Sequence, residues 1–508
     1  MEHSRTYYAK NNIIFGTVNK LATIVLQFVI RTIIIQTLGA EYLGIGSLFS
    51  SIIQALSMTE LGFSAAIVFK MYKPFAEKDE PKICALLAFY KKVYTIIGFI
   101  VLGIGFVILP FLKFLIKGDC PSDSNIYFLY LIYLAGTIIS YFGVAYKTSL
   151  LEVAQRRDIL SIIDTILIIV RSIFQIVFLY LAKNYYWYII WQPVIILANN
   201  LMVAIISKKL FPEYKCYGKL PKEEAKDIIT QVKGLAISKI GVVSRNSFDS
   251  IALSMCSGLI AVSIYSNYYY VFTGVAAFLG VITLGITGGI GNSIATESTE
   301  KNYSDFLKLN FYYSYITAWC TVCLFCLYQP FMQLWVGQDL TASNLTRSLF
   351  CVYFFISEIG QIRSIYGNVS GIWWNLRYFQ IVEMILNPIL NFTLGYKFGM
   401  NGIIIATIFS VTILSIIGIG WKTVVFCFKR APLQYFVLIA SYALITFLAC
   451  IGTGYLCSLF RYEGIIKLLI NGIICIIVPN LFFLVLVFID PMHRGFAKSA
   501  KNLFKRNR

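Results

Sequence analysis

Three ionisable residues lie inside one apolar stretch of the chain. The segment 233–258, KGLAISKIGVVSRNSFDSIALSMCSG, is typical of a membrane-spanning helix, yet it carries Lys239, Arg245 and Asp249. A charged side chain at the centre of a bilayer costs roughly 2.5 to 3.5 kcal/mol even on permissive insertion scales. We therefore expect this helix to face a polar cavity or partners on other helices, and the three residues are candidates for a substrate cavity.

Arg245 and Asp249 are four residues apart, so on a helix they point to the same face. Two interpretations of this spacing remain open. The residues form a self-neutralising pair within a helix bundle, or they form a gated ion pair whose arginine is exchanged between Asp249 and an anionic substrate. Both interpretations place the pair in a polar interior.

The first apolar run carries two further cavity candidates, Lys20 and Arg31. Their separation of eleven residues makes about three helical turns, so both side chains point to nearly one face. The alternative is that Lys20 extends inward and Arg31 outward, each to a headgroup layer. A cavity role is favoured for Lys20, because an internal repeat aligns it with Lys239.

Six more charged residues fall within apolar runs, and we interpret them as a candidate gate or as ion pairs. Asp164 and Arg171 are seven residues apart and share a helix face. Most of the six lie towards the predicted cytoplasmic ends of their spans. With the cavity candidates they make six cations and five anions, so the interior is not strongly cationic by count. The six are Glu60, Asp164, Arg171, Glu358, Arg363 and Glu383.

The composition is that of a polytopic membrane protein. Apolar residues make up 58% of the 508 residues and charged residues only 13%, against about 45 to 50% and about 25% in soluble domains. Continuous apolar runs of 18 or more residues recur, each long enough to cross a hydrocarbon core about 30 Å thick. They predict an all-α helical bundle, because barrel strands would be shorter and alternating.

Several function classes are disfavoured by the same sequence. The net charge of +19 is dispersed between apolar runs, so no nucleic-acid partner is expected. Only two histidines occur, His3 and His493, and no phosphate-binding loop motif is present. Cys320, Cys323 and Cys326 repeat every three residues without other ligands nearby, which favours packing. We expect no enzyme, no metal site and no cofactor.

About fourteen membrane spans are expected. Since their number is even and the basic residues gather in one set of loops, both termini should be cytoplasmic. The predicted spans are 12–37, 45–69, 90–115, 126–147, 159–182, 187–207, 235–257, 261–284, 308–330, 346–366, 378–396, 401–421, 435–458 and 465–489.

An internal repeat predicts two lobes. The offset of 219 residues that relates Lys20 to Lys239 also relates Asp164 to Glu383. It favours two pseudo-symmetric, parallel six-helix lobes followed by two extra C-terminal helices. The expected domains are an N-terminal lobe at 1–207, a cytoplasmic linker at 208–233, a C-terminal lobe at 234–430, and two additional helices with a basic tail at 431–508.

Two motifs carry a resemblance to a known family. They are TLGAEYLGIGSLFSSI at 37–52 and ELGFSAAI at 60–67, with a weaker match in SGLIAVSIYSNYYYVF at 257–272. With them the chain resembles the Wzx-type polysaccharide flippases of the multidrug/oligosaccharidyl-lipid/polysaccharide exporter superfamily. The resemblance covers essentially the whole chain and implies a MATE-like fold.

That resemblance implies transport of undecaprenyl-diphosphate-linked oligosaccharide across the bacterial cytoplasmic (inner) membrane by alternating access, for capsule, O-antigen or exopolysaccharide synthesis. Lys20, Lys239 and Arg245 match by position the cationic cavity residues of the family. The implied partners are the lipid-linked oligosaccharide, membrane lipids, a polysaccharide polymerase and glycosyltransferases. Coupling to Na⁺, H⁺ or the membrane potential would supply the driving force.

Three alternatives remain. An ion-coupled multidrug antiporter of the same superfamily is disfavoured because the first span carries Lys20 and Arg31 and no acid. A lipid II flippase is the second alternative, and the sequence separates it from a polysaccharide flippase only by overall likeness to each family. A membrane scaffold for glycan assembly is disfavoured because it has no use for costly buried charges.

Overall fold

Every regular element in the described part of the chain is a helix, which confirms the all-α prediction. The computed structural model describes residues 5–60, 62–118, 120–121, 123–143, 145–460 and 462–489. Packing divides the chain into two units, Met1–Ser266 with Gln380–Gly399, and Asn267–Phe379 with Met400–Arg508. The lobe boundaries expected from the sequence follow chain order instead, and they stay a prediction.

The first unit contains the helices up to α10 and the middle of α15. Side-chain caps begin several of its helices. The Asp79 carboxylate accepts from the Lys82 amide at the start of α4, and the Asn125 side chain accepts from the Tyr127 amide at the start of α5. The elements are α1 (Arg5–Thr37), α2 (Ala40–Leu56), the 3₁₀ helix η1 (Ser57–Glu60), α3 (Phe63–Ala76), α4 (Glu80–Ile108), the 3₁₀ helix η2 (Leu109–Leu115), α5 (Ile126–Phe142), α6 (Ala145–Val153), α7 (Arg157–Ala182), α8 (Tyr185–Ile189), α9 (Trp191–Leu210) and α10 (Lys222–Ser257).

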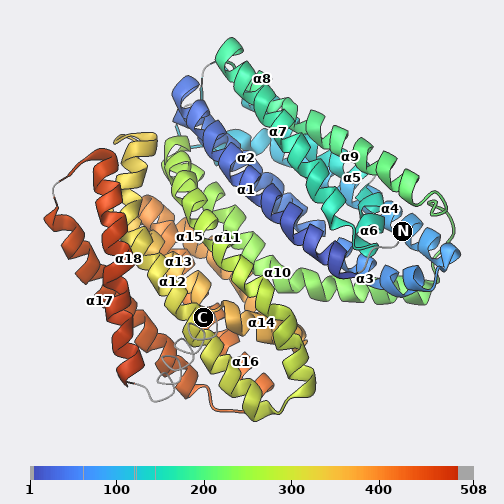
Figure 1. Cartoon of the computed structure of the whole chain (residues 1–508). Helices are drawn as coiled ribbons and strands as arrows, with labels where there is room; N and C mark the ends of the chain where they lie inside the picture. The colour runs from blue at the N-terminus through green and yellow to red at the C-terminus, as the bar shows by residue number, and fades with distance from the viewer. Residues whose placement is uncertain are drawn as a thin grey trace. The chain divides into compact units, whose positions relative to one another are not determined.

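In the second unit α12 packs against α13, α17 and α18, and α17 and α18 pack against each other (Figure 1). Gly399 has a φ of 58° and interrupts α15, between the predicted spans 378–396 and 401–421. The elements are α11 (Leu259–Thr296), α12 (Thr299–Val336), α13 (Asn344–Ile359), α14 (Gln361–Val369), α15 (Trp373–Ser410), the π-helix η3 (Val411–Ile419), α16 (Gly420–Phe428), α17 (Leu433–Leu459) and α18 (Gly464–Ile489).

The exact number of fourteen spans is not confirmed. Within the described ranges nine helical stretches are long and apolar enough to cross a membrane, or ten if α5 and α6 count as one span. The difference has local causes. The predicted spans 45–69 and 346–366 are broken into shorter helices, 235–257 carries too many charges, and 378–396 and 401–421 fall in one stretch, Trp374–Phe428.

The segment expected as a linker helix runs into the charged span without a break. Pro221 precedes the first residue of α10, and Glu223 and Glu224 occupy its first turn, as expected at a helix start. The helix then continues for 36 residues to Ser257. It packs in the first unit against α2 and α3.

Alanine at Gly44 is expected to destabilise the first unit. A Cβ atom at Gly44 would overlap the main-chain carbonyl of Leu259. Overpacking of this kind costs about 1 to 3 kcal/mol. We expect Gly44→Ala to lower the unfolding temperature in detergent, followed by tryptophan fluorescence. Gly16→Ala in α1 is the control, because nothing lies within 4 Å of a Cβ there. Equal unfolding temperatures for Gly44→Ala and the parent would contradict the close approach.

Candidate functional site

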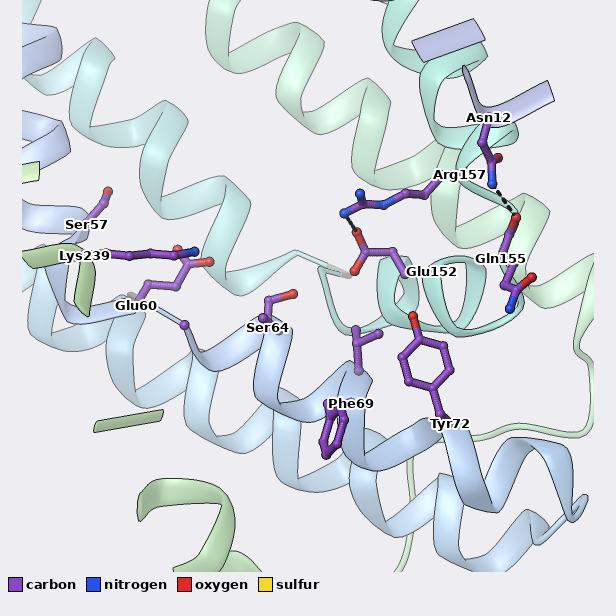
Figure 2. A pocket seen from close by; sticks show the side chains of 13 residues that line it. Asn12, Ser57, Glu60, Ser64, Phe69, Tyr72, Glu152, Gln155, Arg157 and Lys239 are labelled. Atoms are coloured by element: carbon purple, nitrogen blue, oxygen red, sulfur yellow. Dashed lines mark hydrogen bonds and ion pairs between the residues drawn. The ribbon is translucent and has the colours of Figure 1, made fainter. Parts of the chain in front are cut away.

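A polar cavity of about 910 Å³ lies in the first unit (Figure 2). It collects side chains from α1, η1, α3, α6, α10 and the residues around the start of α7. Most of these side chains are polar, which is costly inside a membrane protein unless a polar ligand or water is held there. The lining residues are Asn12, Ser57, Glu60, Gly62, Ser64, Ala65, Val68, Phe69, Tyr72, Glu152, Gln155, Arg157 and Lys239.

A break between α2 and α3 positions Glu60 at this cavity. The predicted span 45–69 is not continuous, because η1 follows Leu56 and Gly62 adopts a φ of 84° before α3 begins. A Cβ atom at Gly62 would lie 2.5 Å from the Cβ of Leu235 on α10, so a glycine is needed both for the backbone and for the approach of α10. The Glu60 carboxylate accepts a hydrogen bond from the Tyr94 hydroxyl.

Lys239 lines the same cavity as Glu60, and Figure 2 draws both side chains towards one end of it. Its side chain is exposed, and it makes no hydrogen bond or ion pair with any residue that the structure describes. At the other end Arg157 pairs with Glu152 at 2.9 Å, and Asn12 donates to the Gln155 carbonyl at 3.0 Å. Among the lining cations Lys239 is thus the one left available to an anionic ligand.

A second cavity, of about 340 Å³, contains both Arg31 and Arg171. Arg31 donates to the Ser266 hydroxyl at 2.7 Å. Arg171 has a buried Nε without a partner and makes no hydrogen bond or ion pair within the described ranges. The described lining includes no acid, and the residues are Gln27, Ile30, Arg31, Ile34, Leu43, Gly46, Ser47, Ser50, Tyr133, Arg171, Gln175, Tyr185, Tyr188 and Gln192.

Two further cavities share residues with the cavity that contains Arg31 and Arg171, called here the arginine cavity. One of about 410 Å³ shares Arg171 and contains Asp164, and one of about 390 Å³ shares Tyr133 and Gln192. Asp164 accepts from Asn199 Nδ2 at 2.6 Å and does not form an ion pair with Arg171 in this structure. The shared face predicted for Asp164 and Arg171 therefore leads to a common cavity, and not to a direct pair.

Arg245 and Asp249 each bind a partner from another helix. Arg245 forms a salt bridge with Glu383 on α15, with side-chain exposures of 11% and 2%. Asp249 accepts from the Tyr265 hydroxyl at 2.9 Å and from Asn391 Nδ2 at 2.6 Å. Neither residue lines the cavities described above, so Arg245, Asp249 and Glu383 hold α10 against α15 in the first unit.

The remaining predicted site residues lie apart from these cavities. Lys20 is exposed on α1 and makes no hydrogen bond or ion pair with the described residues. In the second unit Glu358 accepts from the Tyr313 hydroxyl at 2.8 Å, and Arg363 donates to the Ser415 carbonyl and, at 2.9 Å, to its hydroxyl. Buried Glu358 and Arg363 therefore form hydrogen bonds with residues of their own unit.

The first turns of α10, before the predicted span, carry exposed charges. Lys70 pairs with Asp227 at 2.5 Å, and Lys82 pairs with Glu224. The hydrogen bond from Lys70 holds the pKa of Asp227 below its ordinary value. Exposed pairs of this kind contribute little to stability. Their effect is to fix where the base of α10 lies against α3 and α4.

The sequence and the fold are similar to those of known transporters. The model of the polysaccharide biosynthesis protein family matches residues 9–285. No curated protein matches the chain. The fold is similar to a structure of the lipid II flippase MurJ in an inward closed conformation, with a TM-score of 0.63, 16% identity, and coverage of 94% of this chain and 99% of that chain.

Two structures of MATE transporters are similar as well. An outward-facing multidrug resistance MATE family transporter of the MOP superfamily has a TM-score of 0.55 and 14% identity, over 83% of this chain and 96% of that one. A MATE transporter from Vibrio cholerae has a TM-score of 0.55 and 12% identity, over 84% and 97%. These likenesses confirm the MATE-like fold class. With more than half of its residues matched by the family model, this multi-pass membrane protein belongs to the polysaccharide biosynthesis protein family.

Proposed function

We propose that the protein is a flippase that moves an undecaprenyl-diphosphate-linked oligosaccharide from the cytoplasmic to the outer leaflet of the cytoplasmic membrane. The observation that carries the proposal is that two polar cavities of the first unit hold cations without a partner in the described residues, Lys239 in one and Arg171 in the other. A diphosphate needs such cationic donors, and a low dielectric strengthens the contact. Family membership supports a polysaccharide precursor as the cargo.

The two cavities suit different parts of this substrate. The arginine cavity contains the amides of Gln27, Gln175 and Gln192 as well as Arg31 and Arg171. Amide and guanidinium groups donate hydrogen bonds to phosphate and hydroxyl oxygens alike. The larger cavity, at the end of the unit that carries the basic loops, would receive the headgroup first from the cytoplasm, while the lipid tail stays in the bilayer.

The proposal includes an orientation and a cycle. Both termini are cytoplasmic, and transport proceeds by alternating access coupled to Na⁺, H⁺ or the membrane potential. A polysaccharide polymerase would consume the flipped repeat unit, and glycosyltransferases would supply it. Lipid II transport and multidrug antiport are the competing activities, and the assay below separates them by substrate.

Purified protein in liposomes is expected to make a lipid-linked oligosaccharide of the host accessible to a membrane-impermeant glycosidase. Arg31→Ala and Arg171→Ala should each slow this reaction about 10-fold or more, because a hydrogen bond to a charged group is worth about 1.5 to 3 kcal/mol. Arg171→Lys should keep part of the rate.

The control for that assay is Arg377→Ala, since Arg377 is a half-buried arginine of the second unit that stacks on Trp374 at 4.4 Å and does not line the described cavities. Equal rates for the parent, Arg31→Ala and Arg171→Ala would remove the arginine cavity from the transport path. Transport of lipid II or of cationic drugs, with no transport of the oligosaccharide lipid, would replace the proposed function by the corresponding alternative.

A further inference from the structure

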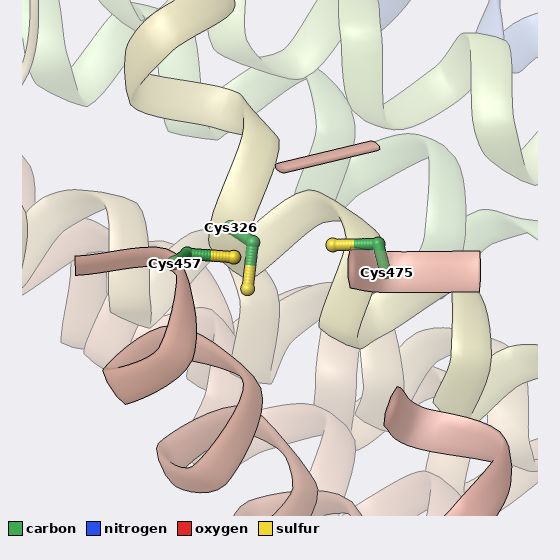
Figure 3. Close-up of side chains that lie close together, drawn as sticks. All are labelled: Cys326, Cys457 and Cys475. Atoms are coloured by element: carbon green, nitrogen blue, oxygen red, sulfur yellow. The ribbon is translucent and has the colours of Figure 1, made fainter. Parts of the chain in front are cut away.

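Three buried cysteines from three helices meet in the second unit (Figure 3). Cys326 lies on α12, Cys457 near the end of α17, and Cys475 on α18. Their Sγ atoms all lie within 4.8 Å of one another, and the three residues are 7%, 6% and 1% exposed. From the sequence alone a packing role is expected for Cys326, because its neighbours along the chain offer no further ligands. The other two thiols come from more than 130 residues away.

Helix packing holds the three thiols together. α12 contacts both α17 and α18 along its length. The Trp319 indole N–H donates to the Cys475 carbonyl at 2.9 Å. This hydrogen bond fixes the position of α18 along the axis of α12. Gly452 lets α17 approach α18, because a Cβ atom there would lie 2.5 Å from the ring of Phe482. These packing contacts between the helices, rather than contacts between the sulfur atoms, therefore determine where the three sulfur atoms lie.

The donor set is that of a soft metal ion. Thiolates bound at about 2.3 Å around one ion lie about 4 Å apart, which fits three sulfurs within 4.8 Å. Thiolate ligands select Cu⁺ and Zn²⁺ among the common ions. Zn²⁺ takes four ligands in structural sites. The cluster also contains Cys323 and Cys450, and Cys323 contacts the Cys475 thiol. Neither sulfur belongs to the group of three that lie within 4.8 Å of one another, so a three-sulfur site favours Cu⁺.

A guanidinium touches this cluster through Phe325, one of the side chains packed against it. Arg347 stacks on the ring of Phe325, the residue before Cys326, at 4.4 Å. Its Nε is buried without a hydrogen bond, and its side chain forms no salt bridge in the described part of the chain. Two thiolates, one retained thiol ligand, Cu⁺ and the guanidinium sum to zero net charge. Binding of Cu⁺ would then release two protons, and no uncompensated charge would stay in the apolar core.

We propose that Cys326, Cys457 and Cys475 form a binding site for a soft d¹⁰ metal ion, Cu⁺ in preference to Zn²⁺, which ties α17 and α18 to α12. The ion stabilises the second unit, since a ligand that binds only the folded state raises its stability. The site is independent of the transport cavities, because those lie in the first unit.

The test is Cu⁺ binding to the full-length protein in detergent, without oxygen, in competition with bicinchoninate. The parent should retain one Cu⁺ per chain. Cys326→Ala, Cys457→Ala and Cys475→Ala should each weaken binding at least 10-fold. Cys351→Ala and Cys84→Ala are matched controls, because both cysteines are buried and lie outside the cluster, and both variants should bind Cu⁺ as the parent does. Zn²⁺ in the same assay should bind more weakly.

Two measurements on the parent protein keep the proposal testable if a variant does not fold. X-ray absorption at the copper edge should show sulfur ligands alone, and Cu⁺ should raise the unfolding temperature. Nitrogen or oxygen ligands, absence of retained Cu⁺, tighter binding of Zn²⁺, or unchanged binding in all three alanine variants would overturn the site. A disulfide between two of the three cysteines in protein purified without reductant would overturn it as well.

Discussion

Arg245→Ala is expected to reduce the amount of folded protein in the membrane severalfold. Arg245 and Glu383 form a salt bridge in which both side chains are almost fully buried, at 11% and 2% exposure. Removing one partner leaves the other charge buried and unpaired, which costs about 3 to 5 kcal/mol. That cost is a large part of the roughly 5 to 15 kcal/mol by which a folded domain is stable. Fluorescence-detected size exclusion of detergent-solubilised membranes measures the folded amount.

Paired substitutions separate this structural role from a role in transport. Arg245→Met combined with Glu383→Leu removes both charges, and it should recover most of the folded protein because replacing a whole buried pair by apolar groups is often neutral. Arg377→Ala, at a half-buried arginine whose hydrogen bonds are exposed to solvent, should leave the folded amount unchanged. A normal amount of monodisperse Arg245→Ala protein would show that the salt bridge does not hold α10 against α15.

Lys239→Ala is expected to lower surface polysaccharide about 10-fold or more while the protein stays at its normal level. Lys239 is exposed to the larger cavity and forms no hydrogen bond or ion pair with the described residues, so its loss strands no buried partner. A charge-assisted hydrogen bond to the cargo is worth about 1.5 to 3 kcal/mol. Surface glycan per unit of protein, measured in a strain that lacks the chromosomal copy, gives the effect.

The matched control for Lys239 is Lys92→Ala, an exposed lysine on α4 that does not line the described cavities. Lys239→Arg should retain most of the export because it keeps the charge at the cavity. Full export by Lys239→Ala would exclude the lysine from the path. An equal loss of export in Lys92→Ala would show that the effect comes from the general basic charge of this unit.

Hydropathy and residue spacing predict much of the fold, and they fail where a partner is distant in sequence. The alternation of apolar runs and basic loops predicted helices that the structure contains. The four-residue spacing of Arg245 and Asp249 predicts that both side chains lie on one face of a helix, and both residues do lie on α10. The same spacing suggests that the two residues pair with each other, whereas each binds a residue of another helix. Their partners Glu383 and Asn391 are 138 and 142 residues away, and no pattern within α10 indicates them.

The candidate site shows the same limit. Lys239 was predicted from its cost in an apolar span, and the structure places it at a cavity. The break after Leu56 is not predicted, because the run 45–69 is apolar enough to be interpreted as one helix. The residue in the sequence that could have indicated the break is Gly62, which adopts a positive φ before α3. Intramembrane amides such as Gln27 and Gln175 were also visible in the sequence, and their convergence on Arg171 depends on packing between helices.

The unbroken course of α10 has a mechanical consequence. A helix of 36 residues is about 54 Å long, well beyond a hydrocarbon core about 30 Å thick. Lys239 lies about 25 Å along this rod from its exposed base at Lys222. A small tilt imposed at the base is therefore carried to the cavity as a displacement of the lysine.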